Sequence, residues 1–310
     1  KAIIDICGLT GREITINDII FKIGPRINAS GRMQNAKETV SLLIERNYKS
    51  AYHNADMINH YNEQRKDLDK SMTEEANKIV ENLKENNDHK AIVIYNEEWH
   101  KGVIGIVASR LTEIYFQPAV VLTRTDDLAT GSARSVAGFD IYSAIASCRD
   151  ILENFGGHTY AAGLSLKVEH IPEFKRRFEE YVQKNILHEQ TLPNIDIDAV
   201  IGFQDITHKF FMDMKRFQPF GPDNKKPVFC SEHVYDYGTS KVVGREQEHI
   251  KLELVDNKSS KIMNGIAFGQ SSQARYIKTK QSFDIVYTLE DNTHKRGEIQ
   301  LQIEDIKPSE

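Results

Sequence analysis

The sequence predicts an α/β protein in which a long connector helix is followed by an α/β domain and then by a small antiparallel β-barrel domain. Residues 33–101 contain neither glycine nor proline, which favours long helices. Over the next stretch of about 100 residues, apolar strands alternate with helices, as in a single α/β domain. Beyond Pro193, apolar residues recur with a period of two, which is typical of short antiparallel strands.

Length and composition are those of a globular chain of two or three domains. Hydrophobic residues make up 40% and charged residues 27% of the 310 residues, which supplies enough apolar side chains for folded cores. No apolar run approaches the roughly 20 residues that span a bilayer, so the sequence excludes a transmembrane protein. The chain starts at Lys1 without a signal peptide or an initiator methionine, and we expect a fragment of a longer protein.

The cysteines and the charge restrict the possible functions. Cys7, Cys148 and Cys230 lie far apart and form no C-x-x-C pair, which argues against disulfides and structural zinc and predicts a reducing, cytoplasmic location. The net charge is -5, and residues 201–310 carry 16 basic and 16 acidic residues. A nucleic-acid site would therefore be a local basic patch, and not a domain that is basic over its whole surface.

A first helix is predicted from Asn35, which serves as the N-cap while Glu38 reaches back to it. Its apolar face would consist of Ala36, Val40, Leu43 and Ile44.

A second, much longer helix carries one narrow apolar stripe at three- and four-residue steps. The stripe consists of Ala51, Ala55, Ile58, Tyr61, Leu68, Met72, Ala76, Ile79 and Leu83. A helix of roughly 50 Å with one such stripe is typical of a connector between two bodies. The alternative is the seam of a coiled-coil dimer, which the Ala, Met and Tyr content of the stripe disfavours.

The α/β domain is predicted between residues 90 and 190. Buried strands are expected at 91–95 and 119–123, and further strands at 130–136 and 160–168, with helices at 102–114, 141–152 and 171–187. After Pro193 we expect a helix at 206–217 and short strands at 228–229, 234–237, 251–255, 262–268, 283–287 and 299–303. These strands indicate a small antiparallel barrel or sandwich.

The first candidate motif is GPRINASGR at residues 24–32. Its glycines and proline would set a fixed backbone, and Arg26 and Arg32 could both face an anion through their rigid guanidinium groups. The alternative is a loop before a helix with solvated arginines.

The second motif, WHKGVIGIVASR at residues 99–110, lies where a buried strand turns into a helix. Ligands often bind at such turns in α/β folds. Gly102 and Gly105 would allow close backbone approach, and the helix N-terminus offers free N–H groups. Alternatively, the glycines only permit helix packing.

The third motif is GSARS at residues 131–135. Ser132 and Arg134 share one face of a strand because side chains alternate with a period of two. Together with backbone N–H groups they could hold one phosphate. The alternative is an ordinary polar edge strand.

The fourth motif is FGGHTYAAG at residues 155–163. Gly156 and Gly157 would let the backbone bend so that His158 projects into an open site. The small residues at 161–163 would let a ligand pack closely. Alternatively, His158 is one of the many histidines that are structural or merely exposed.

These four motifs, in this order, resemble the DHH phosphoesterase superfamily, and most closely its RecJ family of single-strand-specific 5′→3′ exonucleases. The corresponding family segments are GPRINAxGR, WHxGVIGIVASRL, GSxRS and GGHxxAAG. The segment FQPFGPDN at residues 217–224, followed by residues 227–229, resembles the start of the RecJ OB-fold domain. The resemblance covers nearly the whole chain.

The departures from the family pattern concern its metal ligands. The superfamily holds metal with an N-terminal domain that contains Asp-His-His, and this sequence has no Asp-His-His. Asp88-His89-Lys90 resembles a remnant in a charged turn. Asp196 and Asp198 would share one strand face, and we interpret them as part of a boundary strand. Lys101 and Thr159-Tyr160 stand where family members often carry proline.

The resemblance implies a C-terminal part of a nuclease. Residues 1–50 would be the tail of the DHH domain, 51–90 the connector helix, 91–190 the DHH-associated domain and 195–310 an OB-like antiparallel β-barrel. The implied phosphate and nucleic-acid contacts are Arg26, Asn28, Arg32, Ser132, Arg134, Gly156, Gly157 and His158, with no catalytic or metal-binding residue in this chain.

The implied parent protein hydrolyses single-stranded DNA with Mn²⁺ or Mg²⁺ in DNA repair and recombination. Its partners would be single-stranded DNA and a single-strand-binding protein or helicase, and the chain would be a monomer without membrane contact. Two alternatives stay open, namely a non-catalytic module that binds single strands or a partner protein, and a relative that acts on nucleotides. Tyr235, Tyr237, Phe268 and Tyr276 are expected in the β-domain core more than on a stacking platform.

Overall fold

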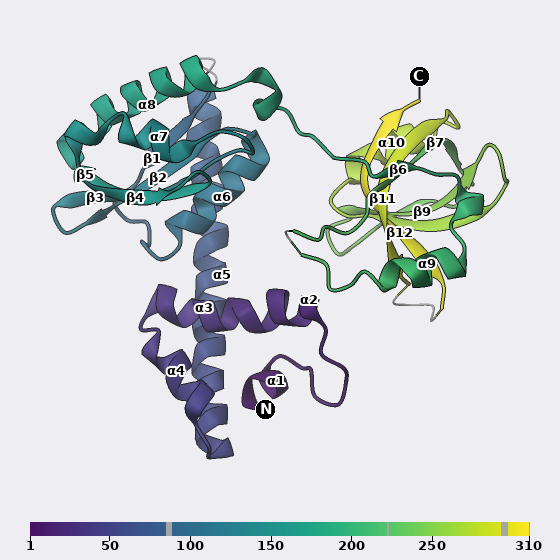
Figure 1. The fold of residues 1–310 in the computed structure, drawn as a ribbon, viewed down its shortest axis with the longest axis horizontal. Helices are drawn as coiled ribbons and strands as arrows, with labels where there is room; N and C mark the ends of the chain where they lie inside the picture. The colour runs from purple at the N-terminus through teal and green to yellow at the C-terminus, as the bar shows by residue number, and fades with distance from the viewer. Residues whose placement is uncertain (85–88, 222, 293–296, 310) are drawn as a thin grey trace. The chain divides into compact units, whose positions relative to one another are not determined.

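The computed structural model describes residues 1–84, 89–221, 223–292 and 297–309. These residues form two compact units, Lys1–Pro193 and Asn194–Glu310, shown in Figure 1. Each unit has hydrophobic clusters of its own. Among the helices in these ranges, none combines the length and the apolar character that a membrane span requires.

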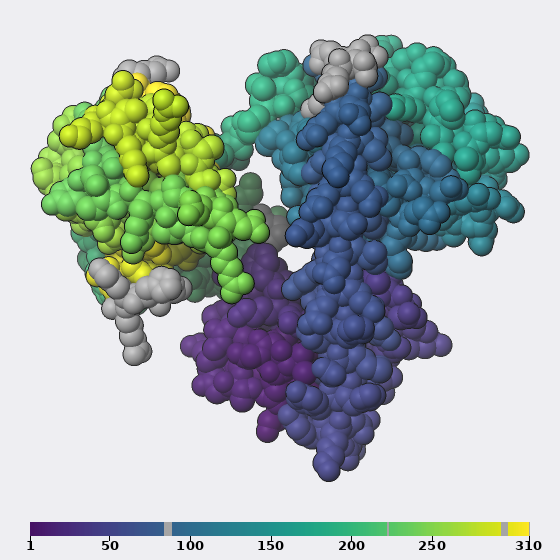
Figure 2. All heavy atoms as spheres, turned by 180° about the vertical axis from the view of Figure 1, so that it is seen from behind, coloured from purple at the N-terminus to yellow at the C-terminus, as the bar shows by residue number. Residues whose placement is uncertain are grey.

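The first unit is organised around α5 (Tyr48–Lys84), a single helix of 37 residues. Its N-terminal half packs against three short helices through Ala55 and Ile58, and its C-terminal half packs against the sheet domain through Met72 and Ala76. The other side of α5 is exposed along the unit, as Figure 2 shows from behind. Neighbours within the same unit therefore account for the apolar stripe, as the connector interpretation predicts.

The three short helices that pack against α5 are α1 (Ala2–Ile6), α3 (Gly24–Met33) and α4 (Lys37–Ile44). Before α3 come α2 (Ile16–Asp18) and one turn of π-helix at Ile19–Ile23.

The predicted apolar face of the first helix is wrong. In α4, Val40, Leu43 and Ile44 are exposed, whereas Thr39 and Leu42 are buried. Thr39 is buried because its hydroxyl group donates to the Ile27 carbonyl at 3.1 Å. A tertiary hydrogen bond to α3 thus turns the helix away from the orientation that apolar periodicity predicts.

The start of α4 also differs from the prediction. The helix begins at Lys37, and Ala36 occupies the N-cap position. The Asn35 side chain still accepts from the Lys37 N–H group at 2.9 Å, but Glu38 faces Tyr61 of α5 at 3.5 Å and does not reach back.

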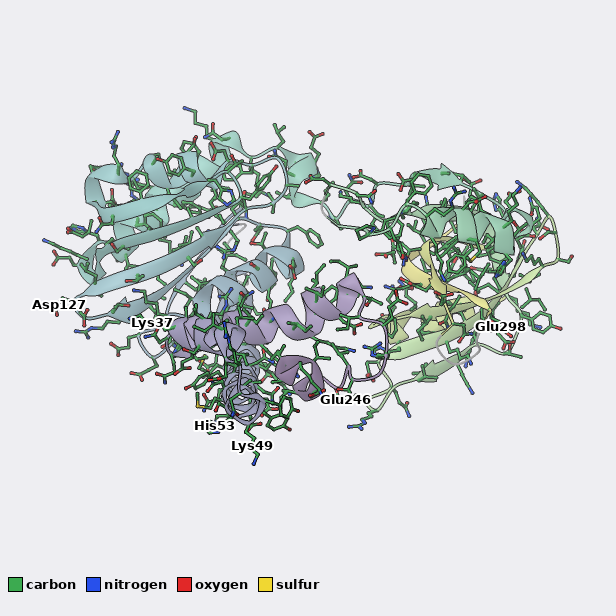
Figure 3. The ribbon with its side chains drawn as sticks, turned by 60° about the horizontal axis from the view of Figure 1, so that its bottom comes forward. Lys37, Lys49, His53, Asp127, Glu246 and Glu298 are labelled. Carbon is green, nitrogen blue, oxygen red and sulfur yellow. The ribbon has the colours of Figure 1, made fainter. Side chains whose placement is uncertain are left out.

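A five-stranded sheet with the order β1-β2-β3-β5-β4 forms the rest of the first unit. Only β1 and β2 are parallel, and the other pairs are antiparallel. The strands are β1 (Ile92–Tyr95), β2 (Ala119–Thr125), β3 (Leu128–Arg134), β4 (Leu152–His158) and β5 (Ala161–Lys167). Asp127, labelled in Figure 3, lies in the turn between β2 and β3.

Strand β4 is absent from the sequence prediction, which places a helix at 141–152 and a bend at the glycine pair. In the structure α7 (Ile141–Ala146) ends early, a 3-10 turn follows at Arg149–Ile151, and the strand begins at Leu152. As an edge strand, β4 buries neither of its faces fully. It therefore lacks the period-two pattern by which a half-buried strand is recognised.

Helices cover the two faces of the sheet unequally. α7 and α8 (Ile171–Asn185) cover one face through Phe174, Phe178 and Ile145. On the other face, α5 and α6 (Ile104–Tyr115) pack over β1 and β2, and α6 also contacts β3. The half of this face that β3, β5 and β4 form is left partly exposed.

The second unit contains a closed five-stranded barrel. Its strand order is β7-β11-β12-β10-β9, and β7 pairs with β9 to close the barrel. The strands are β7 (Phe229–Asp236), β9 (His249–Asp256), β10 (Ile262–Ala267), β11 (Phe283–Asp291) and β12 (Ile299–Pro308), with short additional strands β6 (Ala199–Val200) and β8 (Lys241–Val243) and helices α9 (His208–Lys215) and α10 (Ala274–Ile277).

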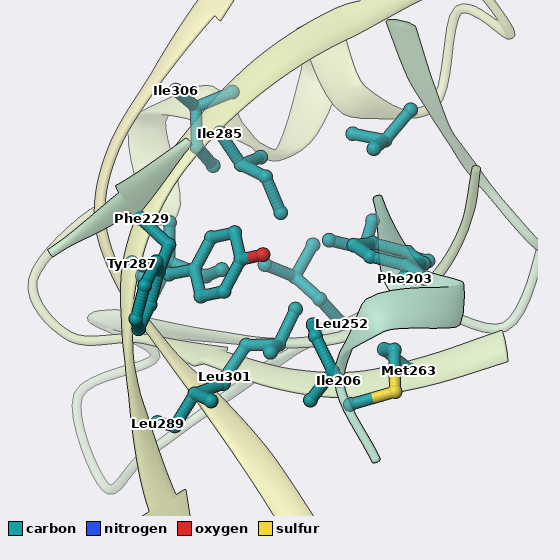
Figure 4. Packing of buried hydrophobic residues seen from close by; sticks show 14 of the residues in the cluster. Phe203, Ile206, Phe229, Leu252, Met263, Ile285, Tyr287, Leu289, Leu301 and Ile306 are labelled. Carbon is teal, nitrogen blue, oxygen red and sulfur yellow. The ribbon is translucent and has the colours of Figure 1, made fainter. Parts of the chain in front are cut away.

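The barrel is not wholly antiparallel, because β10 runs parallel to β12 and β6 parallel to β7. The two strands predicted at 228–229 and 234–237 are one strand, β7. A register shift opposite Asp284, with His233 at φ 51°, breaks its alternation. Tyr287 lies fully buried in the barrel core (Figure 4), where its hydroxyl group pairs with that of Ser231 at 2.8 Å.

Candidate nucleic-acid interface

A pocket of about 490 Å³ in the first unit is lined by the end of α3, the turn before α6, and β3. Its charged lining residues are Arg32, Lys101 and Arg134, and no carboxylate is among the described residues that line it. Three cations without a counter-charge favour an anionic ligand.

Ser132 and Arg134 lie on the same face of β3, as the period of two predicts. The Arg134 guanidinium group donates to the Ser132 hydroxyl oxygen at 2.9 Å and to the Ala133 carbonyl at 2.8 Å. Burial, and then the positive charge of Arg32, lower the pKa of Arg134 from its ordinary value. The interpretation of residues 131–135 as an edge strand is wrong, because β3 lies between β2 and β5.

Gly102 and Gly105 bring the three elements of the pocket together. A Cβ atom at Gly102 would lie 2.1 Å from the Arg32 carbonyl oxygen, and Arg32 donates to the Gly102 carbonyl at 3.1 Å. A Cβ atom at Gly105 would lie 3.0 Å from both Arg134 and Ser132 side-chain atoms. Gly102 thus serves packing, whereas Gly105 keeps space open beside the proposed phosphate contacts.

Arg26 and Arg32 do not converge as expected. Residues 24–33 form α3, with Pro25 in its first turn, and two positions six residues apart on a helix differ by roughly 120° around its axis. Arg26 donates to the Asn59 side chain of α5 at 2.8 Å and to the Lys22 carbonyl at 2.8 Å. Only Arg32 lines the pocket. Asn28 is exposed and lies one turn before Arg32 on the same helix face.

His158 lies on the same open half-face of the sheet as Arg134. The register pairs Arg134 with Ala161, and Ala161 with His158, so the three side chains share one face. At about 4.8 Å per strand, the Arg134 and His158 Cα atoms are roughly 10 Å apart. Ala161 lies between them, and Gly163 and Gly156 follow on the same face, so this part of the sheet carries only small side chains or none.

Gly157 has a different role from Gly156. Its φ is +156°, and a Cβ atom there would lie 2.3 Å from the Ala161 carbonyl oxygen, whereas nothing lies within 4 Å of a Cβ atom at Gly156. The glycine at 157 therefore permits close approach of β4 and β5, and no bend occurs at this pair.

Gly157→Ala is expected to destabilise the first unit by about 1–3 kcal/mol, because the added methyl group meets backbone atoms that cannot move aside. Urea unfolding followed by the fluorescence of Trp99 measures this, since Trp99 is the only tryptophan of the chain and is buried in the first unit. Gly156→Ala is the matched control and should unfold at nearly the wild-type urea concentration. Equal destabilisation by both variants would contradict the close-approach account.

Sequence reasoning did not identify a charge network that joins α5 and α6 around the buried carboxylate of Asp69. Asp69 of α5 is 3% exposed and accepts two hydrogen bonds from Arg110 of α6, at 2.7 and 2.8 Å. Arg65 lies 3.5 Å from the same carboxylate. The sequence offers one indication of this network, because Arg65 and Asp69 are four residues apart beside the apolar stripe and so can pair on one helix face. The network fixes α6, and with it Gly105, against α5.

The candidate metal ligands do not assemble in the described part of the chain, where no three His, Cys, Asp or Glu side chains cluster to hold an ion. Asp196 and Asp198 precede β6 and are not part of a strand, and Asp198 accepts from the Val228 N–H group at 2.8 Å. Asp88 lies outside the described residues, and His89 faces Glu179 at 3.9 Å. The described residues therefore do not fit a carboxylate-held divalent cation.

In the barrel, two of the four aromatic residues expected in the core lie on the surface. Tyr237 is 57% and Phe268 55% exposed. The Phe268 ring stands edge-on to His249 with 5.0 Å between ring centroids. Tyr276 packs against the barrel core beside Phe283, as expected.

Comparison with known proteins agrees with this geometry. Residues 88–184 match the DHHA1 domain family and residues 197–305 the RecJ OB domain family. The chain is 33% identical to the single-stranded-DNA-specific exonuclease RecJ of Bacillus subtilis, over all of the chain and 39% of that protein. It is 28% identical to RecJ of Haemophilus influenzae, over 99% of the chain and 54% of that protein.

Solved structures show the same fold. RecJ of Thermus thermophilus in complex with Mn²⁺ superposes with a TM-score of 0.82 at 24% identity, over 99% of this chain and 43% of that one. An exonuclease RecJ bound to manganese gives a TM-score of 0.51 at 31% identity, over 59% of this chain and 45% of that one. The chain thus spans about two fifths to half of the relatives that it matches. With a DHHA1 domain followed by a RecJ OB domain and similarity along its whole length, the chain belongs to the RecJ family.

Proposed function

We propose that the chain is the part of a single-stranded-DNA-specific 5′→3′ exonuclease that binds phosphates and the DNA strand, and that this exonuclease acts in DNA repair and recombination. The observation that carries this proposal is the pocket in which Arg32, Ser132 and Arg134 converge without a carboxylate. Charge-assisted hydrogen bonds from such groups hold a phosphate in a fixed position. A fixed phosphate presents the neighbouring scissile bond to the hydrolytic centre in one orientation.

Within this proposal, residues 1–50 are the tail of the DHH domain, 51–90 the connector helix, 91–190 the DHH-associated domain and 195–310 the OB domain. The relatives of known structure were crystallised with Mn²⁺ or Mg²⁺, and such an ion activates water for phosphodiester hydrolysis. Because the described residues do not fit such an ion, we place its ligands in the parent protein outside them. Arg32, Ser132, Arg134 and His158 hold the substrate, while Arg26 supports α3 against α5.

The isolated 310-residue chain is expected to release no nucleotides from single-stranded DNA in the presence of manganese. The reason is that the described residues bring no metal-binding carboxylates together. Nucleotide release is measured with purified protein against a heat-inactivated control. Manganese-dependent release above that control would contradict the proposal that the metal ligands of the parent protein lie outside the described residues.

The barrel is proposed to bind single-stranded DNA on the surface formed by β9 and β10. Strand register places Lys251 opposite Ile266, and exposed Phe268 stands beside His249 at the end of the same surface. Exposed aromatic rings with neighbouring cations are the usual means by which OB folds hold unpaired bases. A single-strand-binding protein or a helicase is a proposed partner of the parent protein, and the chain is proposed to be monomeric.

A second candidate function is a non-catalytic module that binds single strands. The observation in its favour is the same lack of clustered metal ligands among the described residues. The coding sequence upstream of Lys1 distinguishes the two, because Asp-His-His encoded there makes the parent a nuclease, whereas a start codon beside Lys1 makes this chain a binding protein.

A further inference from the structure

We propose that His100 is a further anion contact of the pocket, which donates a hydrogen bond from its Nε2–H group to the bound phosphate. This inference rests on the proposed phosphate-binding role of the pocket. His100 lines the pocket together with Arg32, Lys101 and Arg134. It comes from the turn before α6 and so approaches the ligand from a different element than Ser132 and Arg134.

The hydrogen bonding of the ring determines which nitrogen can donate. The Gly102 N–H group donates to His100 Nδ1 at 3.1 Å, so a neutral imidazole carries its proton on Nε2. Within the described part of the chain, Nε2 has no hydrogen-bond partner, and the residue is only half-buried. A donor that is free and lines a cationic pocket is suited to an anion.

The backbone holds this ring in place before any ligand binds. The His100 carbonyl accepts from the Val103 N–H group at 2.9 Å and from that of Ile104 at 3.3 Å. Contact with α3 also fixes this turn, because Gly102 packs against the Arg32 carbonyl. A donor fixed in this way loses little conformational freedom when the anion arrives, which favours binding.

His158 repeats this arrangement on the other side of the open half-face. Its Nδ1 atom accepts from the N–H group of Tyr160, again two residues further along the chain, at 3.3 Å. Both imidazole rings therefore keep Nε2–H for a ligand. His100 adds a donor on the side of the pocket that α3 and α6 form, where sequence reasoning considered only glycines and free N–H groups.

The competing explanation is that His100 only shapes the turn by accepting from Gly102. Two substitutions separate the roles, because each preserves one ring nitrogen. His100→Asn keeps a short acceptor for the Gly102 N–H group but has no distal donor. His100→Gln places an amide N–H near the position of Nε2 and gives up the short acceptor.

The test is a titration of the whole chain with inorganic phosphate, followed by NMR of ¹⁵N-labelled histidine side chains and backbone amides. We expect the free chain to show His100 with its proton on Nε2, and phosphate to shift that signal. The phosphate affinity should fall about tenfold in His100→Asn, as expected for one hydrogen bond to a charged group, and remain within about threefold in His100→Gln. Full affinity in His100→Asn, or a proton on Nδ1, would overturn the inference.

Arg134→Ala in the same titration separates this inference from the proposed function. If Arg134→Ala binds phosphate like the wild type, the pocket itself is not the phosphate site. If Arg134→Ala is weakened and His100→Asn is not, only the role of His100 fails. Trp99 fluorescence verifies that each variant is folded. If His100→Asn does not fold, two observations on the wild-type chain decide whether His100 binds phosphate: the ring nitrogen that carries the His100 proton, and the shift of the His100 signal on addition of phosphate.

Discussion

Arg134→Ala is expected to lower the turnover of single-stranded DNA at least about tenfold in the full-length protein. The guanidinium group is placed by its bonds to Ser132 and Ala133 and is partly buried beside Arg32. Loss of one charge-assisted bond to a phosphate costs roughly 1.5–3 kcal/mol. The release of nucleotides from a labelled single strand, expressed as kcat/KM, measures the effect.

Arg124→Ala is the matched control for this prediction. Arg124 lies on the neighbouring strand β2, is exposed, and pairs with Glu97 at 3.5 Å outside the pocket. Its removal changes the net charge by the same amount and should leave turnover unchanged. If Arg134→Ala also leaves turnover unchanged, residues 131–135 are only part of a sheet and the phosphate account fails.

Removal of residues 194–310 is expected to weaken single-strand binding strongly while residues 1–193 stay folded. The barrel core and the clusters of the first unit have no residue in common, so each unit should fold alone. Stacking of unpaired bases, which a duplex hides, is then lost together with the barrel. Fluorescence anisotropy with single- and double-stranded oligonucleotides measures affinity, and Trp99 reports folding of the shortened chain.

The affinity of the whole chain should be modest and should fall as salt rises. The net charge is -5 and residues 201–310 are neutral, so the binding depends on a few local cations. The anisotropy titrations are therefore made at two salt concentrations. Equal affinity for duplex and single strand, or no loss of affinity after truncation, would contradict the proposal that the barrel binds single strands.

The sequence was sufficient for features that depend on local patterns. Apolar periodicity predicted α5 and the buried strands β1 and β2, and the resemblance predicted the DHH-associated and OB-like domains that the comparisons confirm. The shared face of Ser132 and Arg134 followed from strand alternation alone, because this relation requires no tertiary information.

Features that depend on tertiary contacts could not be predicted from the sequence. The glycines and proline of residues 24–32 suggested a loop, but contacts with α5 and the packing of Gly102 hold them as a helix. Strand β4 exists because β5 offers it a partner edge, which its own residues do not encode. His100 could not be identified in advance, because its role depends on the Gly102 N–H group fixing the ring.

The most direct test of the account is a crystal structure of the chain with a short single-stranded oligonucleotide. We expect a phosphate whose oxygens accept from the Arg134 guanidinium and Ser132 hydroxyl groups, with Arg32 beside it. A strand whose phosphates lie on another surface of the first unit, with this pocket empty, would contradict it.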